Sequence, residues 1–164
     1  MTKMLATICT SIALALNMMM SDTNNIYNLY LENAANQQPT LTTTPEGNKV
    51  WRLNGVLHRE DGPASEGADG YRAWLLHGKV HRKDGPAVVW PGEYQSWHLH
   101  DKLHREDGPA VEYEGGDKEW WLHGNKYADA NAWAEAMLKM RNKPHDADAI
   151  ERFLRDILTR EDLI

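Results

Sequence analysis

The sequence has a single cysteine, Cys9, and a single phenylalanine, Phe153, beside seven tryptophans and six tyrosines. One cysteine excludes an internal disulfide framework and a zinc finger built on cysteines. Basic clusters are missing as well: the net charge is −6, and segments 1–48, 49–127 and 128–164 each carry about −2. Nucleic-acid binding depends on clustered lysine and arginine, because phosphate contacts release counterions. The charge therefore argues against nucleic acid as the main partner.

Catalytic signatures are also missing from the chain. No nucleophile elbow, phosphate loop or HExxH motif occurs in the sequence. With 164 residues and 41% apolar content, the chain is long enough to build one globular core. We therefore expect a globular protein that is not an enzyme and that holds no cofactor.

The first twenty residues contain an uncharged run that raises the question of export or membrane attachment. No charged side chain occurs from Met4 to Ser21, but threonine, serine and asparagine dilute the run. One interpretation is that the run precedes the true start of translation. The alternative is a signal peptide or a membrane anchor formed by residues 4–20. We expect residues 1–20 to be a leader and residues 21–48 to form a short helix and a linker.

The middle of the chain, residues 49–127, consists of a 23-residue repeat. Tryptophan and histidine recur at this spacing, and near-identical blocks read HREDGPA, HRKDGPA and HREDGPA. The structural repeat positions are Trp51, Trp74, Trp97, Trp120, His58, His81, His104, Gly62, Gly85 and Gly108. A fixed period indicates units that bury their apolar faces against their neighbours.

Turn residues divide each unit into short β-strands. The pairs Asn54-Gly55 and His77-Gly78 lie between apolar-alternating runs and favour the positive φ angles of tight hairpins. Two registers stay open at this point. A two-residue loop would pair Trp74 with His81, whereas a longer loop would turn the histidine to the other face of the hairpin.

The aromatic-x-x-Asn/His-Gly hairpin in a two-stranded, 23-residue unit resembles the MORN repeat family, over about residues 49–127. The LHREDGPA block resembles a MORN-like variant seen in phage and bacterial accessory proteins. The resemblance implies a mainly β fold, an elongated curved β-meander, with roles in scaffolding, partner binding or membrane contact. By analogy, it implies an accessory factor in the cytoplasm of a bacterial host that binds or inhibits a host component.

Residues 128–164 change from strand-like to helical spacing. Apolar side chains recur helically at Trp133, Ala136, Met137 and Met140, and again at Ile150, Phe153, Leu154, Ile157 and Leu158. Pro144 separates the two stripes. We expect a C-terminal helical pair that caps the open end of the repeat sheet, the alternative being a pair that binds a partner or dimerises.

The recurring histidines and arginines are the obvious candidates for ligand chemistry. Equivalent residues of neighbouring units lie roughly 10 Å apart if each unit adds two strands, whereas zinc ligands lie about 2 Å from the metal. We therefore expect no metal site in one column; a mixed site from His77 and His98 or His100 stays open. Arg59, Arg82 and Arg105 are the candidates for binding a nucleotide or another small anion.

Aromatic residues that break the repeat are the better candidates for partner binding, because the repeat does not require them. They are Trp90, Tyr94, Tyr113 and Trp121. Exposed tryptophan and tyrosine often anchor interfaces, and the alternative is packing under the C-terminal helices. The leading hypothesis is a non-enzymatic module for a macromolecular protein partner. A small anionic ligand and, if residues 4–20 are retained, a membrane-associated scaffold are the alternatives.

Overall fold

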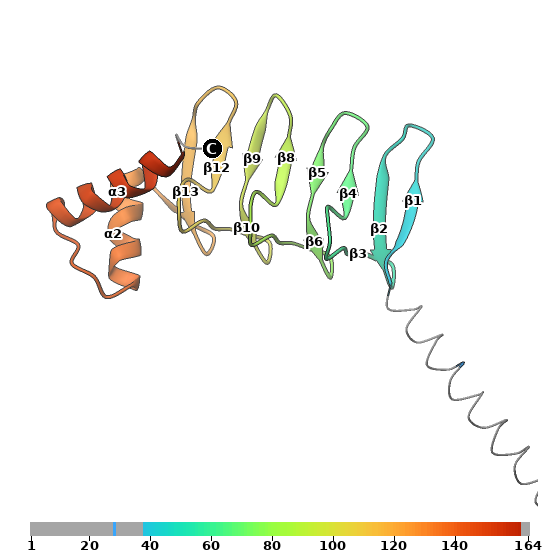
Figure 1. Ribbon diagram of the computed structural model, residues 1–164, viewed down its shortest axis with the longest axis horizontal. Helices are drawn as coiled ribbons and strands as arrows, with labels where there is room; N and C mark the ends of the chain where they lie inside the picture. The colour runs from blue at the N-terminus through green and yellow to red at the C-terminus, as the bar shows by residue number, and fades with distance from the viewer. Residues whose placement is uncertain (1–27, 29–37, 162–164) are drawn as a thin grey trace, which may run out of the picture. The chain divides into compact units, whose positions relative to one another are not determined.

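The computed structural model describes residue 28 and residues 38–161, so the expected leader and most of the expected N-terminal helix lie outside the described residues. Residues Pro39–Ile164 form a compact unit of their own, separate from Met1–Gln38. Its described part is mainly antiparallel β-sheet followed by helices, in agreement with the fold class expected from the sequence (Figure 1).

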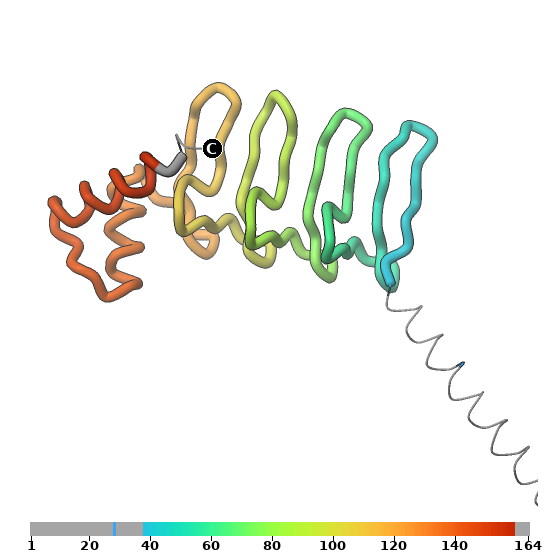
Figure 2. Tube along the Cα trace, viewed as in Figure 1, coloured from blue at the N-terminus to red at the C-terminus, as the bar shows by residue number. Residues whose placement is uncertain are grey.

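One antiparallel sheet runs through the repeat units. Its strands follow in chain order as β1 (Thr40–Thr43), β2 (Lys49–Leu53), β4 (Ser65–Glu66), β5 (Arg72–Ala73), β8 (Val88–Trp90), β9 (Tyr94–Ser96), β12 (Val111–Tyr113), β13 (Lys118–Leu122) and β14 (Asn125–Tyr127). Short hairpins join β2 to β3 (Val56–Leu57), β6 (Leu75–Leu76) to β7 (Lys79–Val80) and β10 (His98–Leu99) to β11 (Lys102–Leu103). Successive units follow the same course side by side (Figure 2).

The short hairpins settle the register that the sequence left open. Leu76 pairs with Lys79 across the two-residue loop His77-Gly78, whose φ angles are 49° and 77°. The N–H of His81 donates to the carbonyl of Trp74 at 3.0 Å, so the histidine lies opposite the tryptophan. Positive φ at both central positions gives a turn whose twist matches that of the strands.

Strand β1 lies where the sequence predicted a linker, and the prediction is wrong for residues 40–43. These residues pair with β2, with Thr40 opposite Arg52. Three of the four are threonines, whose β-branched side chains favour strands, although the neighbouring prolines gave the segment a linker-like composition. All four residues are exposed, as expected of a strand at the edge of the sheet.

Neighbouring units are joined by backbone hydrogen bonds that recur at the same place. The N–H groups of Gly78, Asp101 and Gly124 donate to Leu57, Val80 and Leu103 of the preceding unit at 2.8, 2.9 and 2.9 Å. The alanines that end the HREDGPA-type blocks, Ala64, Ala87 and Ala110, are fully buried. Each unit therefore contributes both polar and apolar contacts to the next one.

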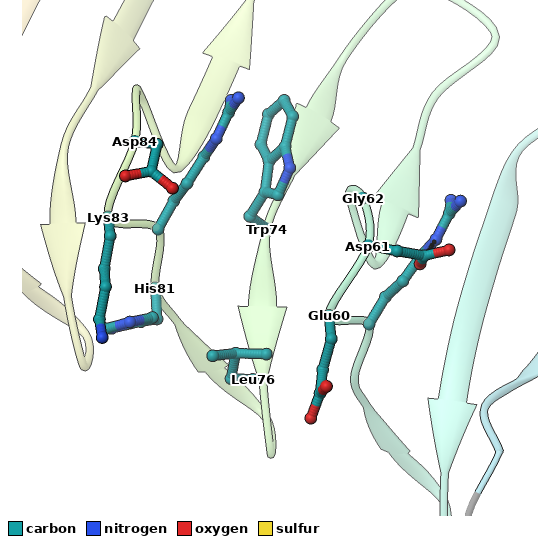
Figure 3. A pocket seen from close by; sticks show the side chains of 10 residues that line it. Glu60, Asp61, Gly62, Trp74, Leu76, His81, Lys83 and Asp84 are labelled. Carbon is teal, nitrogen blue, oxygen red and sulfur yellow. Dashed lines mark hydrogen bonds and ion pairs between the residues drawn. The ribbon is translucent and has the colours of Figure 1, made fainter.

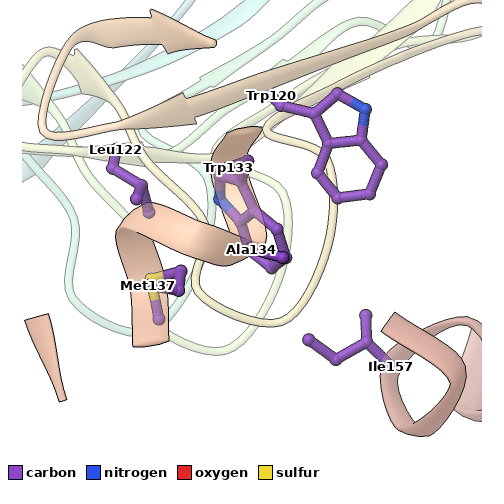
Figure 4. Close-up of a cluster of buried hydrophobic side chains, with 6 residues drawn as sticks. All are labelled: Trp120, Leu122, Trp133, Ala134, Met137 and Ile157. Atoms are coloured by element: carbon purple, nitrogen blue, oxygen red, sulfur yellow. The ribbon is translucent and has the colours of Figure 1, made fainter. Parts of the chain in front are cut away.

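Helices α2 (Ala130–Met140) and α3 (Ala147–Glu161) follow the sheet, as the periodicity predicted. The Asp129 side chain accepts from the N–H of Ala132 and caps α2. The helices form a buried core with the last long strand, made up of Trp120, Leu122, Trp133, Ala134, Met137 and Ile157 (Figure 4). They therefore cover the face of β13 that carries Trp120 and Leu122.

Candidate functional site

Aromatic side chains line up along the ends of the central strands. Tyr71, Trp90, Tyr94 and Tyr113, here called the aromatic ladder, have successive ring centroids 5.6, 6.2 and 6.0 Å apart. Trp90 pairs with Tyr94, and Tyr94 pairs with Tyr113, so cross-strand pairing holds the side chains on one face. Trp90 and Tyr113 remain 40% and 41% exposed. The structure thus brings together three of the four aromatic residues that the sequence singled out.

The ladder borders a shallow depression of about 370 Å³. Besides the ladder residues Trp90, Tyr94 and Tyr113, its lining consists of Val89, Pro91, Gly92, Gln95, Glu112 and Glu114. Gln95 donates to the Glu112 carboxylate at 2.6 Å, and Glu114 is exposed. Gln95 and Glu112 alternate with Tyr94 and Tyr113 along their strands and therefore point to the opposite face of the sheet, where Arg105 contacts Glu112 at 2.6 Å. The exposed carboxylate in this lining is therefore that of Glu114, and the lining contains no basic residue.

Trp121 is the fourth aromatic candidate, and the structure places it apart from the ladder. Its indole N–H donates to the Glu119 carboxylate at 2.9 Å, and the Lys126 ammonium lies 5.5 Å from its ring centroid. The neighbouring Trp120, rather than Trp121, packs against the helices. Sequence reasoning missed Tyr71, which lies opposite Trp90 once the pairing of Arg72 with Val89 is known.

The recurring arginines stack on the recurring tryptophans. The guanidinium carbons of Arg59, Arg82 and Arg105 lie 4.1, 3.9 and 3.9 Å from the ring centroids of Trp51, Trp74 and Trp97. Each guanidinium also donates to the proline carbonyl of its own block, at Pro63, Pro86 and Pro109. These contacts bind the cation inside the unit, as expected of a residue that holds the turn in place.

Two of these arginines also form ion pairs with carboxylates. Arg59 donates to Asp61 at 2.8 Å, which lowers the pKa of that carboxyl group below its ordinary value. Arg105 contacts Asp107 at 2.8 Å and Glu112 at 2.6 Å. Arg59 and Arg105 therefore carry their own anions, which weakens the hypothesis that these two bind an external anionic ligand.

The recurring histidines stack in pairs between units. Ring centroids lie 4.3 Å apart in His58–His77, and 4.2 Å apart in His81–His100 and in His104–His123. The Nδ1 atom of the first ring accepts the backbone N–H of its partner at 3.0, 3.4 and 3.2 Å, respectively. Nδ1 must therefore be unprotonated, so the contacts between turns require neutral imidazoles.

Burial reinforces the neutral state of the histidines. It lowers the pKa of His81, and the neighbouring His100 and Lys83 lower it further. Burial also lowers the pKa of His104, with a further decrease from His123 that Glu106 opposes. Within residues 28 and 38–161, His, Cys, Asp and Glu form no group of three or more that could hold a metal ion.

Open grooves lie between the blocks of successive units. The first groove, about 470 Å³, has Trp74 and Leu76 on its floor, with Glu60 and Asp61 on one side and Lys83 and Asp84 on the other (Figure 3). The second groove, about 690 Å³, has the equivalent residues Trp97 and Leu99 on its floor. Both combine an apolar floor with charged rims. Sequence reasoning missed them because the repeat pattern does not show which side of the sheet the blocks face.

Comparison with known proteins adds no relative: no family model, no curated protein and no solved structure matches the chain. In the part of the chain that the structure describes, no helix combines the length and apolarity needed to cross a membrane. The geometry of the aromatic ladder and of the grooves must therefore carry the functional conclusion.

Proposed function

We propose that this chain is a non-enzymatic, MORN-like repeat protein that acts as a protein–protein interaction module through the aromatic ladder. One observation carries the proposal: Trp90 and Tyr113 are about two-fifths exposed within a continuous row of rings. Isolated exposed apolar side chains are common on proteins, but a contiguous row is typical of an interface. Tryptophan and tyrosine also dominate the binding energy of interfaces.

The chemistry of the surroundings supports a basic protein surface as the partner. Glu93 and Glu114 lie at neighbouring hairpin ends, where the N–H of Glu114 donates to the Glu93 carbonyl at 2.8 Å. Exposed carboxylates beside exposed rings attract cationic side chains, and they steer association more than they add affinity. The net charge of −6 acts in the same direction.

The MORN-like character of the units extends the proposal to the biological role. The LHREDGPA blocks support membership among accessory repeat proteins of phages and bacteria, with an elongated sheet as the scaffold. On this proposal the partner is a host component that is bound and inhibited in the bacterial cytoplasm. A membrane-associated scaffold depends on residues 4–20, which lie outside the described residues.

A capture experiment tests the proposal. Tagged full-length chain is incubated with a bacterial lysate, and the eluted proteins are identified and quantified by mass spectrometry. The Trp90→Ala, Tyr113→Ala double variant should lose a stoichiometric partner that the original chain retains. Val56→Ala serves as the matched control, because Val56 is a similarly exposed apolar residue away from the ladder. Equal capture by the double variant would rule out the ladder as the binding surface.

A further inference from the structure

The face of the sheet opposite to the aromatic ladder carries a row of paired residues beside the recurring arginines. Arg72 follows the ladder residue Tyr71 and Val89 precedes the ladder residue Trp90, so both point to that opposite face. In each unit, one residue of the row lies two positions before the recurring tryptophan and is paired across the strands with a second residue. The three pairs are Lys49 with Glu66, Arg72 with Val89, and Gln95 with Glu112.

Two of these pairs contain a glutamate that the recurring arginine contacts. Glu112 accepts a hydrogen bond from Arg105 at 2.6 Å and another from Gln95 at 2.6 Å. Glu66 lies 3.6 Å from Nη1 of Arg59. In both units the carboxylate thus compensates the charge of the arginine.

The middle unit lacks this carboxylate. Val89 stands at the equivalent position, 23 residues after Glu66 and 23 residues before Glu112. Its paired residue, Arg72, is exposed and makes no hydrogen bond or ion pair within residues 28 and 38–161. On its other side Arg72 lies opposite Glu66, whose carboxylate contacts Arg59 instead.

Arg82, the recurring arginine of the middle unit, is held in place without a carboxylate. Its guanidinium carbon lies 3.9 Å from the ring centroid of Trp74, and its Nη1 atom donates to the Pro86 carbonyl at 3.1 Å. In the part of the chain that the structure describes, it contacts no acidic side chain. A guanidinium has five N–H donors, so Arg82 is oriented and still has donors to offer.

Asp84 does not supply the missing anion. Asp61 and Asp107, at the equivalent positions, each accept from the Nε atom of their arginine at 2.8 Å, whereas the described contacts of the middle block include no such bond. The backbone of this block turns differently, because Gly85 has a φ of 151° and the equivalent Gly62 has no positive φ. The arginine of the middle unit therefore keeps its Nε donor available for a ligand.

We infer that Arg72 and Arg82 bind an oxyanion over Val89, in the place that a glutamate carboxylate fills in the units on either side. Carboxylate and phosphate groups share this chemistry, and arginines bind both through charge-assisted hydrogen bonds. The nearest carboxylates of the row, Glu66 and Glu112, contact their own arginines. The site lies on the face opposite to the aromatic ladder, so its occupancy does not depend on what the ladder binds.

Titration of the full-length chain with inorganic phosphate at constant ionic strength tests the site, with the arginine Nε–H groups observed by NMR. The signals of Arg72 and Arg82 should shift saturably, whereas those of Arg59 and Arg105 should move little because their Nε atoms already donate to aspartates. Arg72→Gln should raise the dissociation constant about tenfold or more. Arg52→Gln, which removes an exposed arginine from the other face of the sheet, is the matched control and should leave it unchanged.

A second pair of variants fills the site from within the chain. Val89→Glu restores the carboxylate of the neighbouring units and should abolish the phosphate-dependent shifts, whereas the uncharged Val89→Gln should retain them. Thermal unfolding confirms that the variants are folded. Phosphate binding by Val89→Glu as tight as that of the original chain would overturn the inference. Shifts of the Arg59 and Arg105 signals as large as those of Arg72 and Arg82 would overturn it as well.

A further titration distinguishes the source of the oxyanion. The probe is a capped tripeptide with a central glutamate, and the same peptide with glutamine is its control. Tighter binding of the glutamate peptide than of phosphate would assign the site to an acidic side chain of a protein. Tighter binding of phosphate would assign it to a phosphate-bearing ligand. Saturable shifts with neither probe would overturn the inference.

Discussion

The histidine pairs and the aromatic ladder belong to different hairpins of the same repeat units and differ in what they contact. His81 is buried, accepts a backbone N–H from the next unit and stacks on His100. Trp90, at the end of β8, contacts other aromatic rings while 40% of its surface is exposed to solvent. The ladder also follows the period, since Tyr71 and Tyr94, and Trp90 and Tyr113, are each 23 residues apart. Burial rather than repetition therefore separates the two sets: the buried histidines join the units, whereas the ladder leaves ring surface exposed to solvent.

The contribution of a recurring leucine to stability should depend on whether other side chains cover it. Leu122 is 1% exposed beneath the helices, whereas the equivalent Leu76 lies partly open on the floor of the first groove. We expect Leu122→Ala to lower the free energy of unfolding by about 2–5 kcal/mol, and Leu76→Ala by less than half of that. Urea denaturation of both variants measures the contrast. Equal losses would show that the grooves are filled in solution.

Acid should weaken the junctions between units before it affects the carboxylates. The folded state holds the pKa of His81 and of His104 below the unfolded value of about 6.5, so the unfolded chain takes up protons first. The free energy of unfolding should therefore fall as the pH decreases below about 6.5, until the lowered folded pKa values are passed.

The His81→Gln variant provides the control for this pH effect. The glutamine carbonyl can still accept an N–H but does not titrate, so the decrease between neutral pH and about pH 5 should become smaller. Denaturant titrations at several pH values measure it. A decrease of the same size in this variant would remove His81 from the account.

The sequence predicted these junctions only in part. The repeat and its hairpins could be predicted because Asn-Gly and His-Gly pairs impose positive φ, and the two-residue loop then follows the usual geometry. The contact between His58 and His77 could not be predicted, because comparing the repeats with one another identifies equivalent positions but not the positions that are in contact. Tyr71 was missed although it lies 23 residues before Tyr94, and the pairing of β5 with β8 then shows that it contacts Trp90.

The arginine–tryptophan stacks should make a moderate contribution to the free energy of unfolding. Arg105 lies on Trp97 and donates to Pro109, Asp107 and Glu112. Lysine keeps the charge but lacks the planar fork, so Arg105→Lys should cost about 1–2 kcal/mol of stability. Chemical denaturation measures the loss. A fully stable Arg105→Lys variant that had lost a bound anion would instead support a ligand site.

The ladder should contribute least to stability. Trp90→Ala removes an exposed ring whose contacts are Tyr71 and Tyr94, so the free energy of unfolding should change by about 1 kcal/mol or less. The same variant should lose most of its partner binding. Trp121→Ala, on the separate surface beside Glu119, should keep both stability and binding. Loss of binding in Trp121→Ala alone would move the interface to β13.

The most direct test of the central claim is site-specific photo-crosslinking in bacterial cells. A photoreactive phenylalanine analogue is placed at Tyr113 in the ladder or at Val56, which is similarly exposed beside the turn between β2 and β3. The account predicts one discrete crosslinked partner from position 113 and none from position 56. The same partner crosslinked from position 56 and not from position 113 would contradict the assignment of the ladder as the binding surface.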